Sequence, residues 1–259
     1  MKDSFVWKDA SFSSFGLAFA ASASYVIVIL GYMASEDVRK MLYFKDAKKF
    51  VSAHNLILCF ASLGMFLGCL YEVVKRSQEE NSIDWLFCEH MNTVPVGALW
   101  FYSYLYYLSK YYELLDTFLQ LFSGKVPPNF FLHVYHHSLV IFMSWIWIET
   151  TASMQFIGLL FNTAVHVVMY YYYYLRSRGI VPWWKNYVTS FQIVQFVTSL
   201  VSFIVTLYFV WTRRSLGADR QCKGIPTVFG SLAFNITLLY GFVNILNSSK
   251  KKLGKKSED

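Results

Sequence analysis

Seven long uncharged stretches alternate with short charged segments along the 259 residues of the chain. A helix needs about 20 mainly apolar residues to cross a bilayer, because the hydrocarbon layer is ~30 Å thick and a helix rises ~1.5 Å per residue. The pattern therefore predicts seven transmembrane helices, at about 13–34, 51–72, 94–122, 129–148, 153–175, 187–211 and 226–247. These spans take up most of the chain, so we expect a single membrane domain over residues 1–259 that ends in a basic tail at 248–259.

The composition points to lipid as the solvent. Hydrophobic residues make up 56% of the chain and charged residues 15%, whereas soluble domains carry about 25% charged residues. A soluble fold of this composition would expose more apolar surface than water tolerates. We therefore expect an all-α integral membrane protein. The first stretch is too long and too evenly apolar for a cleaved signal peptide, and we interpret it as a retained helix.

Lysine and arginine are shared unequally between the two sides of the predicted bundle. The segments that would face one side hold 14 of them, and the segments that would face the other side hold 8. Because positive loops are retained in the cytosol, this bias predicts an N-terminus outside the cytosol and a cytosolic C-terminus. The net charge of +7 then reflects this bias and attraction to anionic lipid headgroups, and we expect no nucleic-acid partner.

Polar side chains recur at helical spacing inside four of the predicted spans. Such groups are costly in lipid and usually face the bundle interior, and residues three or four apart share one helix face. From the third to the sixth span these faces hold Lys110, Glu113, Asp116 and Thr117, then His133, His136 and His137, then Asn162, His166, Met169 and Tyr170, and finally Thr189, Gln192 and Gln195. Four polar faces on consecutive spans predict one interior site, which we expect to open to the cytosol.

Each motif also has a structural interpretation when it is taken alone. The Lys110–Glu113 stripe could be an ion pair at a helix end, and the amides of the sixth span could hold helices together. We interpret Tyr172–Tyr174 as an interfacial aromatic belt, and His54 of the second span as a packing residue. Three histidines within five residues at membrane depth are much harder to explain by structure alone.

The four motifs, in this order, resemble the pattern of the ELO family of very-long-chain fatty acid elongases. The family pattern is Lys-x-x-Glu-x-x-Asp-Thr, His-x-x-His-His, Asn-x-x-x-His-x-x-Met-Tyr and Thr-x-x-Gln-x-x-Gln, and every fixed position matches between Lys110 and Gln195. The resemblance implies a bundle of seven helices that encloses an acyl tunnel. It also implies residence in the endoplasmic reticulum membrane, with a luminal N-terminus and a cytosolic C-terminus.

The activity implied by this resemblance is that of a 3-ketoacyl-CoA synthase. Such an enzyme condenses a long-chain acyl-CoA with malonyl-CoA, releases CoA and carbon dioxide, and uses no cofactor besides its substrates. A ketoacyl reductase, a dehydratase and an enoyl reductase complete the elongation cycle and are the implied partners.

The residues of the four motifs suit this reaction. None of them is a cysteine, but histidine can form an acyl-imidazole intermediate or act as a base or hydrogen-bond donor. We expect His136 to carry the acyl group, with His137, His166 and His133 completing the catalytic cluster. The expected substrate-binding residues are Lys110, Glu113, Asp116, Asn162, Tyr170, Gln192 and Gln195, together with three basic residues for phosphate and carboxylate groups, Lys125, Arg176 and Lys185. The alternative role of the three basic residues is only to set the topology.

Two cysteines fall in loops on the predicted luminal side. Cys88 lies between the second and third spans, and Cys222 lies between the sixth and seventh. The intervening spans return the chain to this side, and the lumen permits disulfides, so we predict a Cys88–Cys222 bridge. The alternative is a pair of unpaired loop thiols. Cys59 and Cys69 are expected to be small packing residues.

Two other functional classes stay open at this stage. A diiron desaturase or hydroxylase also carries His-x-x-His-His boxes, but it needs more histidines than the six of this chain. A zinc site of three histidines is possible by ligand count, although we expect no metal. A seven-span transporter or receptor is the non-enzymatic alternative.

Overall fold

The computed structural model describes residues 2–44, 46–127, 129–215 and 217–255, and these residues form helices and connecting loops. The end of the predicted tail, 256–259, lies outside the described residues. Three short 3-10 helices are η1 (Trp7–Asp9), η2 (Asp84–Leu86) and η3 (Ala218–Arg220). The α-helices are α1 (Phe15–Ala34), α2 (Glu36–Met41), α3 (Ala47–Glu79), α4 (Ala98–Glu113), α5 (Leu115–Phe122), α6 (Phe130–Glu149), α7 (Gln155–Ser177), α8 (Lys185–Arg213) and α9 (Ile225–Lys255).

Five of these helices are long and apolar enough to cross a membrane, namely α1, α3, α6, α8 and α9. The prediction of an all-helical membrane protein is thus confirmed. Helices also occupy most of the two other predicted spans, because 94–122 contains α4 and α5 and α7 covers 153–175 from Gln155 onward.

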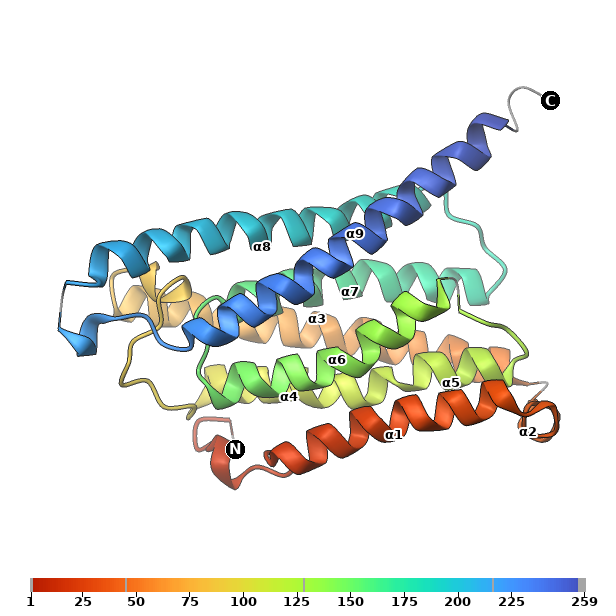
Figure 1. Cartoon of the computed structure of the whole chain (residues 1–259), viewed down its shortest axis with the longest axis horizontal. Helices are drawn as coiled ribbons and strands as arrows, with labels where there is room; N and C mark the ends of the chain where they lie inside the picture. The colour runs from red at the N-terminus through yellow and green to blue at the C-terminus, as the bar shows by residue number, and fades with distance from the viewer. Residues whose placement is uncertain (1, 45, 128, 216, 256–259) are drawn as a thin grey trace.

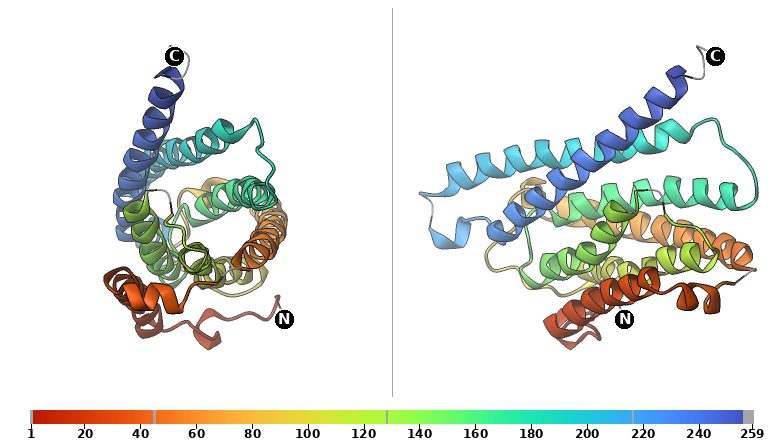
Figure 2. Two further views of the ribbon diagram at one scale, coloured as in Figure 1. Left: turned by 90° about the vertical axis from the view of Figure 1, so that its right-hand side faces the viewer. Right: turned by 45° about the vertical axis from the view of Figure 1, so that its right-hand side comes forward.

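The long helices run side by side along the longest axis of the molecule (Figure 1). The most extensive packing joins α3 to α7, while α1 packs against α6 and α8 against α9. The last turns of α9 slope away from the other helices at the right-hand side of Figure 1, and Figure 2 shows the same departure.

The third predicted span departs from a continuous helix. It begins only at Ala98, after Gly97, whose φ of +87° favours glycine. It is interrupted at Leu114, where backbone bonds run from Leu114 to Tyr111 and from Thr117 to Leu114 instead of four residues back. Such tightened turns redirect a helix. The polar residues Asp116 and Thr117 lie on α5, directly after this break.

The loops 80–97, 150–154 and 217–224 close one end of the bundle, and we call them the disulfide cap. Cys88 and Cys222 are bonded with an S–S distance of 2.00 Å, so the predicted bridge is confirmed. His90 and Cys222 also form an isolated β-bridge. Ser153 joins the third loop to the others, since its hydroxyl accepts from the Glu89 amide (2.9 Å) and donates to the Lys223 carbonyl (2.8 Å).

Charged side chains fix the disulfide cap to α3. Arg76 donates two hydrogen bonds to Glu89, at 2.8 and 2.6 Å, although Glu89 is buried. Partial burial disfavours the charge of Glu80, but hydrogen bonds from His90 and Arg76 hold the pKa of Glu80 below its usual range. The cap is therefore held by ion pairs as well as by its disulfide.

Candidate active site

A cavity of about 1080 Å³ runs between the helices. Its lining includes residues along the whole of α7, from Gln155 to Ser177. Since α7 has 23 residues, the cavity follows that helix for ~30 Å. Other lining residues come from α3, α5, α6, α8 and α9.

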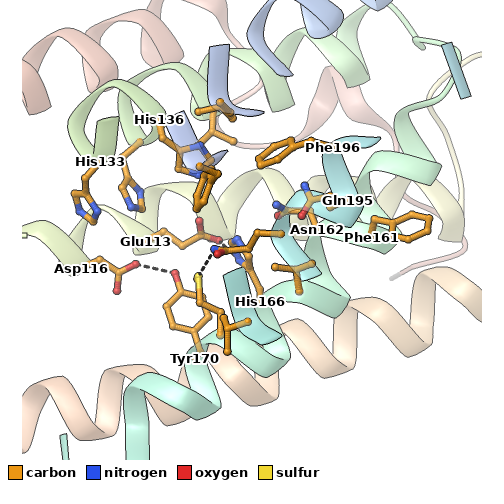
Figure 3. Close-up of a pocket in the computed structure, with 18 of the residues that line it drawn as sticks. Glu113, Asp116, His133, His136, Phe161, Asn162, His166, Tyr170, Gln195 and Phe196 are labelled. Atoms are coloured by element: carbon orange, nitrogen blue, oxygen red, sulfur yellow. Dashed lines mark hydrogen bonds and ion pairs between the residues drawn. The ribbon is translucent and has the colours of Figure 1, made fainter. Parts of the chain in front are cut away.

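All four predicted histidines line this cavity (Figure 3). The imidazole of His137 lies 4.4 Å from that of His133 and 5.3 Å from that of His136, measured between ring centroids. His166 approaches from α7 on the facing side of the site. The one-turn spacing on α6 thus places three imidazoles together, and His166 of α7 lines the same cavity as the fourth.

A buried charged cluster lies beside His166. Lys110 donates to Glu113 Oε1 (2.8 Å) and to Asn162 Oδ1 (3.1 Å), and both Lys110 and Glu113 are 1% exposed. Glu113 Oε1 lies 3.5 Å from Nδ1 of His166. Glu113 and Asn162 line the cavity, whereas Lys110 packs behind them with its ammonium over the ring of Tyr106. Lys110 is therefore placed to hold Glu113 and Asn162 rather than to meet a ligand.

Asp116, three residues after Glu113, joins α5 to α3 and α7. Its Oδ1 lies 2.8 Å from Nε2 of His54 on α3, and its Oδ2 accepts a 2.7 Å hydrogen bond from Tyr170 on α7. Figure 3 shows the bond between Asp116 and Tyr170. The ring of Tyr170 stands edge-on to the imidazole of His166, with centroids 5.3 Å apart.

Thr117, the next residue, contacts side chains on the opposite side of the site. Its hydroxyl lies 2.7 Å from the hydroxyl of Tyr25 on α1 and 2.8 Å from Nε2 of His133 on α6. Thr117 is fully buried. Adjacent residues of α5 therefore reach different histidines, since Asp116 contacts His54 of α3 and Thr117 contacts His133 of α6.

The amides of α8 form part of the cavity wall. Gln192 and Gln195 line the cavity with Thr189, and Gln192 donates to Sδ of Met169 at 3.5 Å. On α9, Asn235 donates to Ser199 of α8 at 2.8 Å.

The two ends of the cavity differ in chemistry. Lys125, Arg176 and Lys185 line it where α7 ends and α8 begins. The other end reaches Ser153 and Met154 of the disulfide cap, and Trp147 lines the cavity on α6 near the cap. One end of the cavity thus carries three basic side chains, and the cap covers the other.

Several residues of the site differ from their interpretation by sequence. His54 lines the cavity and pairs with Asp116, although no neighbour in sequence pointed to such a role. Tyr172 is 8% exposed and lines the cavity with Tyr173, so the interpretation of Tyr172 as part of a lipid-facing belt is wrong. Tyr173 lies seven residues after His166, a spacing that places both on one helix face and is a usable signal.

Within the described residues, no group of three or more histidine, cysteine, aspartate or glutamate side chains has the geometry of a metal site. Imidazoles, carboxylates and amides line the cavity instead, which suits nucleophilic and proton-transfer chemistry.

Comparison with known proteins decides the family. The model of the GNS1/SUR4 family, ELO, matches residues 10–258. The chain belongs to the ELO family.

Relatives of this ELO protein are named as fatty acid elongases. A putative fatty acid elongase of Dictyostelium discoideum is 38% identical over 187 residues, which cover 72% of this chain and 61% of the relative. Fatty acid elongase A of the same organism is 34% identical over 77% of this chain and 71% of the relative. Putative fatty acid elongase 1 of Schizosaccharomyces pombe is 33% identical over 91% of this chain and 70% of the relative.

Proposed function

We propose that this ELO protein condenses a long-chain acyl-CoA with malonyl-CoA to give 3-ketoacyl-CoA, CoA and carbon dioxide, the first step of fatty acid elongation. The observation that carries the proposal is the set of four histidines on one long cavity, from α6 and α7. Family membership and the names of the relatives support it.

In the proposed mechanism His136 carries the acyl group. Its Nδ1 is buried and has no hydrogen-bond partner among the described residues, which leaves Nε2 to attack the thioester carbonyl. The C–N bond forms, the C–S bond breaks, and the imidazole proton passes to the CoA thiolate. Dividing one difficult step into two easier ones is the advantage of a covalent intermediate.

The second half of the reaction forms the new carbon–carbon bond. Malonyl-CoA loses carbon dioxide, and the resulting carbanion attacks the acyl-imidazole carbonyl as the C–N bond breaks. The imidazole then takes up one proton, so the complete reaction consumes one proton and needs no cofactor besides the two substrates. His166, held near Glu113, and His137, in contact with His136, are the groups we assign to orientation and proton transfer.

The shape of the cavity suggests how the substrates lie. Lys125, Arg176 and Lys185 would receive the phosphates of CoA and the malonyl carboxylate at the basic end. The acyl chain would extend from the histidines toward Trp147, along α7 from His166 back to Gln155, eleven positions earlier in the sequence, a depth of ~16 Å. Gln192 and Gln195 would border the chain from α8.

We further propose that α4 with α5 and α7 complete a bundle of seven spans around this acyl tunnel. The N-terminus would lie in the lumen of the endoplasmic reticulum, and the basic end of the cavity would open to the cytosol. The product then requires a ketoacyl reductase, a dehydratase and an enoyl reductase on the same membrane to finish the cycle.

The test is condensation by the purified protein with labelled malonyl-CoA and a series of acyl-CoA lengths. We expect labelled 3-ketoacyl product from the parent protein and none from His136→Ala. The matched control is His90→Ala, since His90 contacts Glu80 beside the disulfide cap. A parent protein without product at every acyl length overturns the function, and a stoichiometric bound metal would favour the metal-dependent alternative. Substantial activity of folded His136→Ala would move the nucleophile elsewhere.

A further inference from the structure

His54 is a buried titratable residue that the mechanism above does not use. It lies in the second turn of α3, 4% exposed, and belongs to none of the four sequence motifs. Its imidazole packs against the ring of Tyr112, with centroids 4.8 Å apart. It also borders the cavity that holds the four histidines.

Neither nitrogen of His54 is free to meet a substrate. Nε2 lies 2.8 Å from Oδ1 of Asp116, and Nδ1 is buried without a hydrogen-bond partner among the described residues. A carboxylate oxygen accepts, so Nε2 carries a hydrogen and donates it to Asp116. The geometry therefore makes the imidazole a donor to Asp116 through Nε2.

Asp116 has both of its oxygens oriented by donors from other helices. His54 of α3 donates to Oδ1, and Tyr170 of α7 donates to Oδ2 at 2.7 Å. The two donors together fix the plane of the carboxylate, because two hydrogen bonds with different directions leave it little freedom to rotate. Tyr170 is fully buried, and its ring edge lies against His166.

We propose that His54 is a positioning residue of the condensation site: by donating to Asp116 it holds the carboxylate that fixes Tyr170 beside His166. This inference rests on the proposed function. Loss of the donor leaves Oδ1 of Asp116 unpaired, so the carboxylate turns and the hydroxyl of Tyr170 loses its fixed acceptor. His166 then loses the fixed ring of Tyr170 at its edge and keeps its contact with Glu113.

The experiment compares variants that differ in one donor. His54→Phe keeps a ring against Tyr112 but removes the donor. His54→Gln places an amide N–H where Nε2 lies, and His54→Asn carries an amide too short to reach Asp116. Cys69→Ala is the matched control, because Cys69 is also buried and lies on the same helix, fifteen residues beyond His54 and outside the cavity lining.

We expect kcat of His54→Phe and His54→Asn to fall about 10- to 100-fold, as small displacements of a positioned group do. The KM for acyl-CoA should stay within about twofold, because the substrate contacts are unchanged. His54→Gln should recover most of the lost kcat, and Cys69→Ala should match the parent protein. Adding Tyr170→Phe to His54→Phe should lower kcat little further, because both changes act through Asp116.

Melting temperatures measured in detergent show whether a variant loses activity because Asp116 is no longer held in place or because the protein no longer folds. Should His54→Phe not accumulate as folded protein, the pair His54→Asn and His54→Gln carries the comparison. If the parent protein is active and both His54→Phe and His54→Asn keep the parent kcat, this inference alone is overturned. It is also overturned if His54→Gln recovers none of the lost kcat. A parent protein without activity overturns the proposed function and the inference with it.

Discussion

Lys110 and Glu113 form an ion pair at 2.8 Å although each side chain is only 1% exposed. Removing one partner of such a pair leaves a buried charge without compensation, which costs about 3–5 kcal/mol. We therefore expect Lys110→Met to lower the free energy of unfolding by that amount, measured in detergent. The double variant Lys110→Met with Glu113→Gln should regain part of the loss, since no buried charge then stays unpaired. A double variant less stable than Lys110→Met would contradict this account.

The hydroxyl of Thr117 joins Tyr25 to His133. Thr117→Val keeps the shape of the side chain but leaves both partners unpaired, at a cost of about 1–3 kcal/mol in stability. We expect condensation activity to fall as well, because His133 loses its orientation. Tyr25→Phe is the matched variant, since the bond between Thr117 and His133 survives, and it should keep near-parent activity. Equal losses of activity in the two variants would show that the hydroxyl of Thr117 does not act on His133.

Gly158 of α7 lies against the indole of Trp147 at the deep end of the cavity. A methyl group added at Gly158 would lie 2.9 Å from Trp147, whose indole donates to Ser231 at 2.8 Å and stacks on Tyr106. The indole must move for that methyl group to fit, and the cavity narrows there. We expect the longest acyl chain that Gly158→Ala produces to be shorter by one elongation cycle. Chromatography of the acyl products measures this length.

The control for this change is Gly64→Ala on α3, where an added methyl group meets no atom within 4 Å. It should leave the product distribution unchanged. An identical distribution for Gly158→Ala would place the end of the acyl chain short of Trp147.

The Cys88–Cys222 bridge closes a loop of 134 residues. A bridge of this kind stabilises the folded state by ~2–4 kcal/mol, so reduction or the double change to serine should lower the melting temperature. Peptide mapping supplies a direct check. Alkylation of the unfolded, unreduced protein should label Cys59 and Cys69, which are free, and leave the other two cysteines blocked.

The proposed orientation predicts where glycans attach. Asn235 begins an acceptor sequence, Asn235-Ile-Thr237, but it lies within α9 and donates to Ser199, so it should carry no glycan. The acceptor sequence at Asn247 lies toward the proposed cytosolic end and should also stay bare. An acceptor tag fused before Lys2 should be glycosylated, and the same tag at the other end should not. A glycosidase-sensitive mass shift of the C-terminal fusion alone would reverse the orientation.

Periodicity along the sequence predicted which residues share a helix face. His133, His136 and His137 fall within one turn, and their rings contact one another in the folded chain. Alternation of the spans likewise placed the loops of Cys88 and Cys222 at one end of the bundle, where they are bonded. Both inferences depend only on the rise and period of a helix, which local sequence sets.

Periodicity along the sequence could not predict which residues of different helices contact one another. Spacing fixes the face on which Asp116 lies but not the helix that comes to meet it, so His54 had no visible partner in the sequence. The break at Leu114 also escaped prediction, and it separates Glu113 of α4 from Asp116 and Thr117 of α5. Lys110 shares a stripe with Glu113, yet it lies behind the cavity wall.

The sequence by itself determined that this chain is helical, lies in lipid and carries an ELO-type histidine site, because hydrophobic runs and polar spacing are local properties. The tertiary structure alone decided which imidazole meets which carboxylate or hydroxyl. Those pairings depend on how α1, α3, α6 and α7 pack around α5. Helix packing is set by side-chain shape over the whole interface, and no spacing within a single helix encodes it.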